Sequence, residues 1–261
     1  MARGRWKRRL GWAGAMVLGG ALVAAPPARA DRRAYGTTYE AVTAPKGELD
    51  VESWMTFAKD GEVGDSAPGG GLRQMEELEY GLTRRWDVAL YNMLDVSAAE
   101  GGTRYAGLKV ESRLRLADPG EWPVDVIGYL EYEWQRAGDA DHSLEAKAIV
   151  ARDFGPWNVA GNLSLELEHL VAGAFHPEVE YALGACRELG GPAVKLGLEA
   201  FGKLEREEGA LQPFVFAGPA VSFAVGHLGP LRGVWLTLAG GRGLTPSSET
   251  AYGRAILGLQ F

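Results

Sequence analysis

Apolar and charged side chains alternate one by one along several segments, and this alternation is what most constrains the fold of this chain. In residues 108–116, Leu or Val fills most even positions, while Lys, Glu and Arg fill the odd ones. Residues 157–168 repeat the pattern, with Trp, Val and Leu set against Asn, Ser and Glu. A period of two places these groups on opposite faces of a strand, whereas a helix would scatter the charges all round. The sequence therefore predicts amphipathic β-strands.

Turn-forming residues divide the chain from residue 47 onward into about 12 such segments, most of them near the ~9–11 residues of a tilted membrane strand. No apolar run after residue 30 approaches the roughly 20 residues of a spanning helix, so entry into a membrane requires a closed sheet. We predict an all-β fold, an antiparallel up-and-down transmembrane β-barrel over residues 47–261. The expected strands are 48–58, 73–83, 86–96, 104–116, 124–134, 143–152, 157–168, 177–187, 192–203, 212–224, 231–241 and 249–261.

Residues 1–30 have the three parts of a secretory signal. Five cations between Arg3 and Arg9 precede the apolar run 10–25, and Ala28-Arg29-Ala30 fits a cleavage site after Ala30. The run is short and rich in glycine, which disfavours a membrane anchor. Residues 31–46 are polar, and we expect them to form a loosely ordered periplasmic lead-in.

Composition limits the partners and the chemistry. Residues 1–30 hold six of the 27 Lys and Arg and no acid, so the mature chain has 21 cations, 34 acids and a formal charge of −13. This balance argues against a nucleic-acid partner. The single Cys186 excludes an internal disulfide, and the four histidines lack metal-ligand spacing. The sequence shows no catalytic motif, so no catalytic residue, metal site or cofactor is predicted.

The last segment alternates back from a terminal aromatic residue. This end resembles the final strand of bacterial outer-membrane β-barrels, and the resemblance implies recognition by the barrel assembly machinery. The chain departs from the usual pattern at Ile256, where glycine is expected. The residues expected to form the assembly signal are Tyr252, Leu257, Leu259 and Phe261.

Periodicity alone does not decide which face points inward, because a soluble lipocalin-like barrel has its apolar side inside. The export signal, the terminal aromatic residue, and short turns at one end with mostly longer polar loops at the other favour outer-membrane lipid around the apolar face. The charged face then lines the lumen, since a cation at the bilayer midplane costs about 2–4 kcal/mol. The expected lumen residues are Glu77, Glu79, Lys109, Glu111, Arg113, Arg115, Glu131, Glu133, Glu145, Lys147, Glu166, Glu168, Glu178, Glu180, Lys195, Glu199 and Arg254.

Acids outnumber bases on this face, which favours a channel for small polar or cationic solutes. Two alternatives stay open. The charges can pair and close a structural or surface-interaction barrel, or the wall can carry a lipid-modifying enzyme site. About 12 strands lie between a filled small barrel and an open porin, so barrel size does not separate a channel from a closed barrel.

Three stretches resemble the outer-membrane β-barrel family assigned to transport in the meta-cleavage pathway of phenol degradation. They are EYGLTRRWDVALY (Glu79–Tyr91), PVDVIGYLEY (Pro123–Tyr132) and ARDFGPWNVA (Ala151–Ala160). These are strand and turn patterns rather than a functional motif. The resemblance therefore implies the barrel fold and an outer-membrane location more than it implies a substrate.

Overall fold

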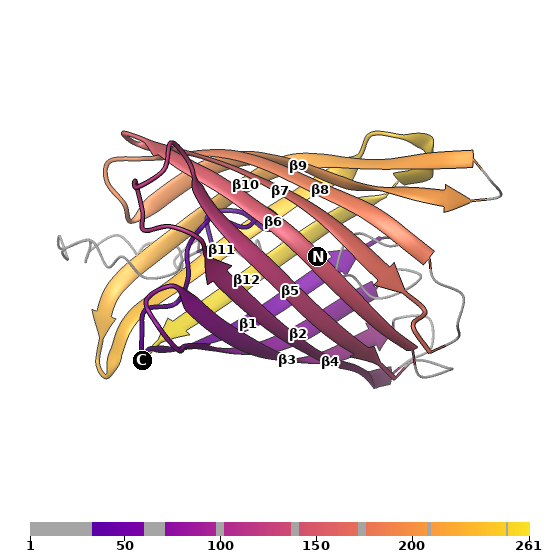
Figure 1. Ribbon diagram of the computed structural model, residues 1–261, viewed down its shortest axis with the longest axis horizontal. Helices are drawn as coiled ribbons and strands as arrows, with labels where there is room; N and C mark the ends of the chain where they lie inside the picture. The colour runs from indigo at the N-terminus through magenta and orange to yellow at the C-terminus, as the bar shows by residue number, and fades with distance from the viewer. Residues whose placement is uncertain are drawn as a thin grey trace, which may run out of the picture.

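Twelve antiparallel strands follow one another around a closed barrel, and the last strand pairs with the first (Figure 1). The computed structural model describes residues 33–59, 71–97, 102–136, 141–171, 176–207, 210–248 and 250–261, so the expected signal at residues 1–30 lies outside it. The strands are β1 (Leu49–Ala58), β2 (Gly71–Gly81), β3 (Trp86–Ser97), β4 (Gly102–Arg115), β5 (Asp125–Gln135), β6 (Asp141–Phe154), β7 (Trp157–Glu168), β8 (His176–Glu188), β9 (Val194–Glu207), β10 (Ala210–Leu228), β11 (Leu231–Gly243) and β12 (Ala251–Gln260).

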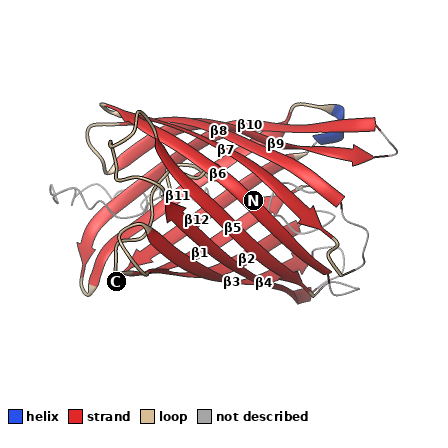
Figure 2. Cartoon of the chain, in the orientation of Figure 1, coloured by secondary structure: helices blue, strands red, loops and turns tan. Residues whose placement is uncertain are grey.

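The predicted all-β, up-and-down barrel is confirmed. Apart from one turn of 3-10 helix at Pro246–Ser248, every helix or strand of the described residues is a strand (Figure 2). No helix within the described part of the chain is long and apolar enough to cross a membrane. The largest boundary difference is at β9 and β10, whose ladder continues to the pair Glu207 and Ala210, beyond the predicted ends at 203 and 212.

We call the end of the barrel that holds the β2–β3 and β4–β5 connections and Phe261 the turn end, and the opposite end the loop end. The expected difference in connection length is only partly present. At the turn end, nine residues separate β4 from β5, whereas at the loop end four separate β3 from β4 and two separate β9 from β10. The separation of β9 and β10 is short because their ladder extends to the pair Glu207 and Ala210.

The outer wall of the barrel is apolar. On β7, Leu163 and Leu165 are 59% and 47% exposed, while Asn162 and Ser164 beside them are buried. The same alternation recurs on β5, where Leu130 is exposed. The apolar faces therefore point outward and the ionic faces inward, as a barrel in lipid requires. The aromatic residues bordering the turn end are also exposed, namely Trp86, Trp122, Phe154 and Trp157.

Residues 33–45 lie inside the barrel, so the expectation of a loosely ordered lead-in was wrong for this segment. Tyr35 is fully buried and packs with Ile127, Ile149 and Cys186 on the inner wall. A Cβ atom on Gly184 would lie 2.6 Å from the Tyr35 ring, so glycine is needed where this ring meets the wall. The polar groups of the segment form hydrogen bonds with polar side chains of the inner wall, which explains why a polar segment is buried there. We call residues 33–45 the lumen segment.

Candidate functional site

Glu199 on β9 is the strongest anchor of the lumen segment. Its carboxylate accepts hydrogen bonds from the backbone amides of Gly36, Thr37 and Thr38 at 3.1, 2.9 and 3.1 Å. Glu199 is only 3% exposed. Three amide hydrogen bonds to one buried carboxylate fix the segment firmly against the wall.

Other inward-facing polar residues bind the rest of the segment. Asn162 on β7 accepts from the Tyr39 amide at 2.7 Å and donates to the Tyr39 carbonyl at 3.0 Å. Asp87 on β3 accepts from the Ala44 amide at 2.7 Å. Lys195 on β9 donates to Glu40 at 3.1 Å. The segment thus bridges opposite parts of the wall and occupies the half of the lumen nearer the turn end.

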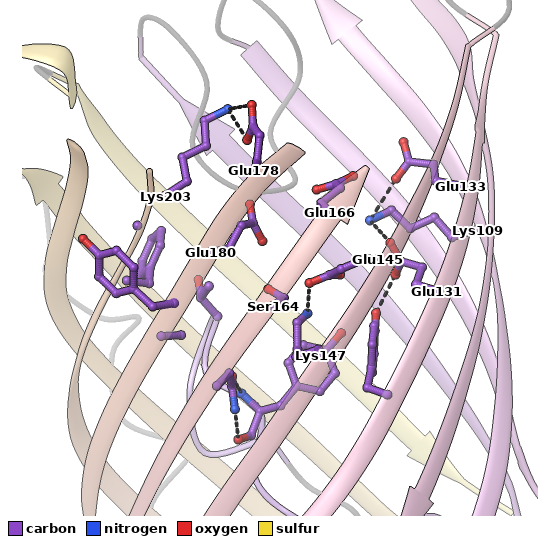
Figure 3. A pocket seen from close by; sticks show the side chains of 18 of the residues that line it. Lys109, Glu131, Glu133, Glu145, Lys147, Ser164, Glu166, Glu178, Glu180 and Lys203 are labelled. Atoms are coloured by element: carbon purple, nitrogen blue, oxygen red, sulfur yellow. Dashed lines mark hydrogen bonds and ion pairs between the residues drawn. The ribbon is translucent and has the colours of Figure 1, made fainter. Parts of the chain in front are cut away.

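The half of the lumen nearer the loop end holds a cavity of about 410 Å³. Acidic and aromatic side chains dominate its wall, and Figure 3 shows Glu166 and Glu180 facing the same space as Lys109, Glu131 and Glu133. We call this space the acidic cavity.

A row of glutamates crosses five neighbouring strands of this wall. The strand register places Glu111 opposite Glu131, Glu131 opposite Glu145, Glu145 opposite Glu166, and Glu166 opposite Glu178. Like charges directly opposite each other on a sheet repel and destabilise the pairing. Because strands tilt in a barrel, a row that follows the register climbs along the barrel axis. This carboxylate row therefore runs from mid-lumen to the loop end.

Cations lie beside four of the five members of the carboxylate row. Arg113 is 3.2 Å from Glu111, and three lysines contact Glu131, Glu145 and Glu178. Lys109 bridges Glu131 and Glu133 at 3.2 and 3.0 Å (Figure 3). Lys147 lies 3.0 Å from Glu145. The same ammonium group lies 4.3 Å from the centre of the Tyr129 ring, so an aromatic face shares in holding the cation.

A third lysine, Lys203, is 2.9 Å from Glu178. The wall of the acidic cavity carries seven glutamates against three lysines and two arginines, Arg73 and Arg254, which leaves an acidic surplus of two. The seven glutamates are Glu131, Glu133, Glu145, Glu166, Glu168, Glu178 and Glu180.

The structure places the predicted lumen residues in four groups. Lys195 and Glu199 bind the lumen segment, whereas Arg115 lies half-buried at the turn end of β4. Glu77, Glu79, Glu111 and Arg113 are buried in the half of the lumen nearer the turn end. Those lining the acidic cavity are Lys109, Glu131, Glu133, Glu145, Lys147, Glu166, Glu168, Glu178, Glu180 and Arg254.

Sequence reasoning included Lys195 and Glu199 among the lumen residues but missed Asn162 and Asp87, which also hold the lumen segment. Asn162 had been placed on the polar face of its strand, but nothing in the local sequence indicates that an amide from residue 39 reaches it. Arg33 was also missed, although it is 8% exposed and its guanidinium lies 4.4 Å from the rings of both Tyr39 and Trp54. The signal available from sequence was an arginine and two tyrosines in a short segment next to a strongly acidic barrel.

The four residues expected to form an assembly signal do not share one face. Leu257 and Phe261 point outward, and the half-buried Leu259, which lies two residues from each of them, is on the same face of β12. Tyr252 instead points inward and packs between Phe201 and Phe216, at ring-centre distances of 5.2 and 6.3 Å. The position of Tyr252 is therefore explained by packing inside the lumen. The assembly role of all four residues stays a prediction.

Comparison with known proteins supports the fold. No protein-family model and no curated protein sequence matches this chain. An outer membrane channel from Pseudomonas putida F1 is similar in structure, with a TM-score of 0.58 and 12% identity over 85% of this chain and 98% of that channel.

Two further solved structures match at lower TM-scores. A bacterial polysaccharide outer membrane secretin gives 0.42 at 10% identity, over 82% of this chain and 98% of the other. An anion-selective porin from Comamonas acidovorans gives 0.39 at 10% identity, over 82% and 97%. The resemblance to the phenol-pathway family stays a prediction, and the chain has the closed barrel fold of outer-membrane channels.

Proposed function

We propose that this chain is a Gram-negative outer-membrane barrel that passes small cations and small polar solutes through its acidic lumen. The carboxylate row from Glu111 to Glu178 is the observation that carries the proposal. Five carboxylates in register repel one another, and a cation moving along them offsets that repulsion at each step. Because the row runs along the barrel axis, it provides successive binding sites for a cation. Each site binds weakly enough for the cation to move on to the next.

Location in the outer membrane is supported by two independent features. The outward faces form an apolar belt, and the lumen holds the charges. The first 30 residues have the pattern of an export signal, which fits delivery to the outer membrane.

The lumen segment narrows the path beyond the acidic cavity. A solute entering at the loop end first meets the cavity and then Tyr39, whose amide and carbonyl are bonded to Asn162. Ions that fit beside the segment pass through the static barrel. A larger solute passes only when the hydrogen bonds to the segment open.

Ion selectivity across a planar bilayer tests this proposal. In a salt gradient, we expect the wild-type protein to pass more cations than anions. Its reversal potential should therefore be displaced from zero toward the equilibrium potential of the cation. The double variant Glu131→Gln with Glu166→Gln removes two charges from the row and should move the reversal potential toward zero. The matched control Glu121→Gln with Glu188→Gln removes the same charge outside the acidic cavity, and should behave as the wild type. Equal selectivity in all three proteins would contradict the proposal.

A closed barrel with a structural or surface-interaction role is the second candidate. The observation that favours it is the dense bonding of the lumen segment, in which Glu199 alone accepts from three backbone amides. The test is conductance in planar bilayers, measured with the wild type and with variants that no longer hold the lumen segment. No conductance from any of these proteins would exclude the channel and support the closed barrel.

A further inference from the structure

Three buried carboxylates lie together on β1 and β2, on the turn-end side of the acidic cavity. One oxygen atom from each of Glu52, Glu77 and Glu79 lies within 4.8 Å of the others. The register places Glu52 directly opposite Glu77, and Asp50 directly opposite Glu79. All four are at most 1% exposed. Two adjacent pairs of opposed carboxylates on a buried face are unfavourable unless positive charge lies among them.

Two guanidinium groups supply part of that charge. Arg33 of the lumen segment donates to Glu52 at 2.9 Å and lies 3.5 Å from Glu77. Arg113 on β4 contacts both Glu79 and Asp87. These two cations contact five buried acids among the described residues. The acids are Glu52, Glu77, Glu79, Asp87 and Glu111.

One oxygen of Glu77 points to a missing ligand. Its Oε2 atom accepts from Trp54 Nε1 at 3.0 Å and from Arg33 at 3.5 Å. Its Oε1 atom is buried and has no hydrogen-bond partner. A buried carboxylate oxygen without a partner is costly, because it has lost water and gained nothing in return. Glu77 is a member of the three-carboxylate group, so a cation held by that group can satisfy this oxygen.

We propose that Glu52, Glu77 and Glu79 form a binding site for a divalent cation, with Ca²⁺ as the ion that fits best. Carboxylate oxygens are the ligands of hard cations, and the site offers neither nitrogen nor sulfur. Ca²⁺ binds oxygen at about 2.3–2.6 Å, so ligands on opposite sides of the ion lie about 4.6–5.2 Å apart, which suits this group. Mg²⁺ requires a tighter octahedron and sheds water reluctantly.

Water completes the coordination, and the acidic cavity gives the ion access. Trp54, which donates to Glu77, also lines that cavity, so the site lies directly behind the cavity wall. The bound ion joins β1 to β2 beside Arg33, and so stabilises both the barrel near its closure with β12 and the docked lumen segment. The site does not depend on solute passage, because a barrel that stays silent in bilayers still binds the ion.

Terbium luminescence excited through tryptophan tests the site, with Tb³⁺ as a stand-in for Ca²⁺ and Trp54 as the nearby sensitiser. The mature chain is refolded in detergent micelles, treated with a chelator and titrated with Tb³⁺, and Ca²⁺ is then added as competitor. We expect a saturable signal that Ca²⁺ displaces. Glu77→Gln should weaken Tb³⁺ affinity at least tenfold, while Glu166→Gln, an equal charge change in the acidic cavity, should leave it within about twofold. Trp54→Phe should lower the signal while Ca²⁺ binding is retained.

Two results would overturn the proposal. One is a wild-type protein without a saturable, Ca²⁺-sensitive signal. The other is a folded Glu77→Gln variant with wild-type affinity. If Glu77→Gln does not fold, Glu52→Gln takes its place.

The thermal unfolding of the wild type provides a test without any substitution. Ca²⁺ should raise its unfolding temperature relative to chelator, and more than Mg²⁺ does. An unfolding temperature that does not change with Ca²⁺ but rises on mild acidification would contradict the metal site. It would show that a proton on the carboxylates, rather than a metal ion, neutralises the group.

Discussion

Replacing Glu199 with alanine tests whether the lumen segment closes the barrel. Glu199 accepts from the amides of Gly36, Thr37 and Thr38, and its Oε2 atom is also 3.3 Å from the Thr38 hydroxyl. Each buried amide that loses its partner costs about 1–3 kcal/mol. Three such losses amount to about 3–9 kcal/mol, and water entering the adjacent space brings the cost toward the lower end.

A cost of about 3 kcal/mol changes the ratio of docked to released segment by roughly a hundredfold. We therefore expect Glu199→Ala to raise the rate of proteolysis within residues 33–45 of the refolded protein by up to that factor, and to raise single-channel conductance. Mass spectrometry of the cleaved fragments locates the cuts. Glu178→Ala is the matched control, because this lumen glutamate, also 3% exposed, contacts Lys203 rather than the segment in the described structure. Equal protection and equal conductance in the two variants would refute a closing role for the segment.

Three further substitutions test the wall, the lumen packing and the turn end. Leu163→Arg places a cation on the lipid face near the middle of β7 and should destabilise the barrel by about 2–4 kcal/mol in urea unfolding from phospholipid vesicles, whereas no effect would argue against lipid contact there. Phe201→Ala removes a ring stacked 5.4 Å from that of Phe216 and should cost about 3 kcal/mol in the same assay, and a loss below about 1 kcal/mol would contradict this packing. The Arg85 guanidinium beside Asp118 lowers the pKa of that carboxyl below its ordinary value of 3.8, so the pair stabilises the fold above pH 3.8 and this contribution is lost as the pH falls further. Asp118→Asn should therefore make the free energy of unfolding fall slightly less steeply as the pH drops below 3.8. An unchanged pH dependence would show that this exposed pair contributes nothing to stability.

The fold was predictable because it depends on a period of two that survives along the whole barrel. Charged residues on β4 and β5 alternate with apolar ones so regularly that the inward and outward faces follow from sequence alone. The chain order of the strands also required no long-range information, since each strand pairs with the next. Only the closing pair of β1 and β12 joins distant parts of the chain.

The candidate site was less predictable because it depends on contacts between distant residues. Tyr35 bonds to Asn158, which lies 123 positions further along the chain. No periodicity marks residues 33–45, so sequence alone described them as a polar lead-in. The carboxylate row likewise depends on register. The order of strands shows that Glu131 and Glu166 flank β6, but only the observed pairing places Glu145 between them, with Lys147 opposite Tyr129 and Ser164 instead.

The reversal potential of single channels in a potassium chloride gradient tests the central claim most directly, because it reports the sign of the charge that crosses the lumen. An acidic lumen with a continuous carboxylate row predicts a potential displaced toward the equilibrium potential of potassium, and a smaller displacement at high salt, where charges are screened. A potential displaced toward that of chloride would contradict the account.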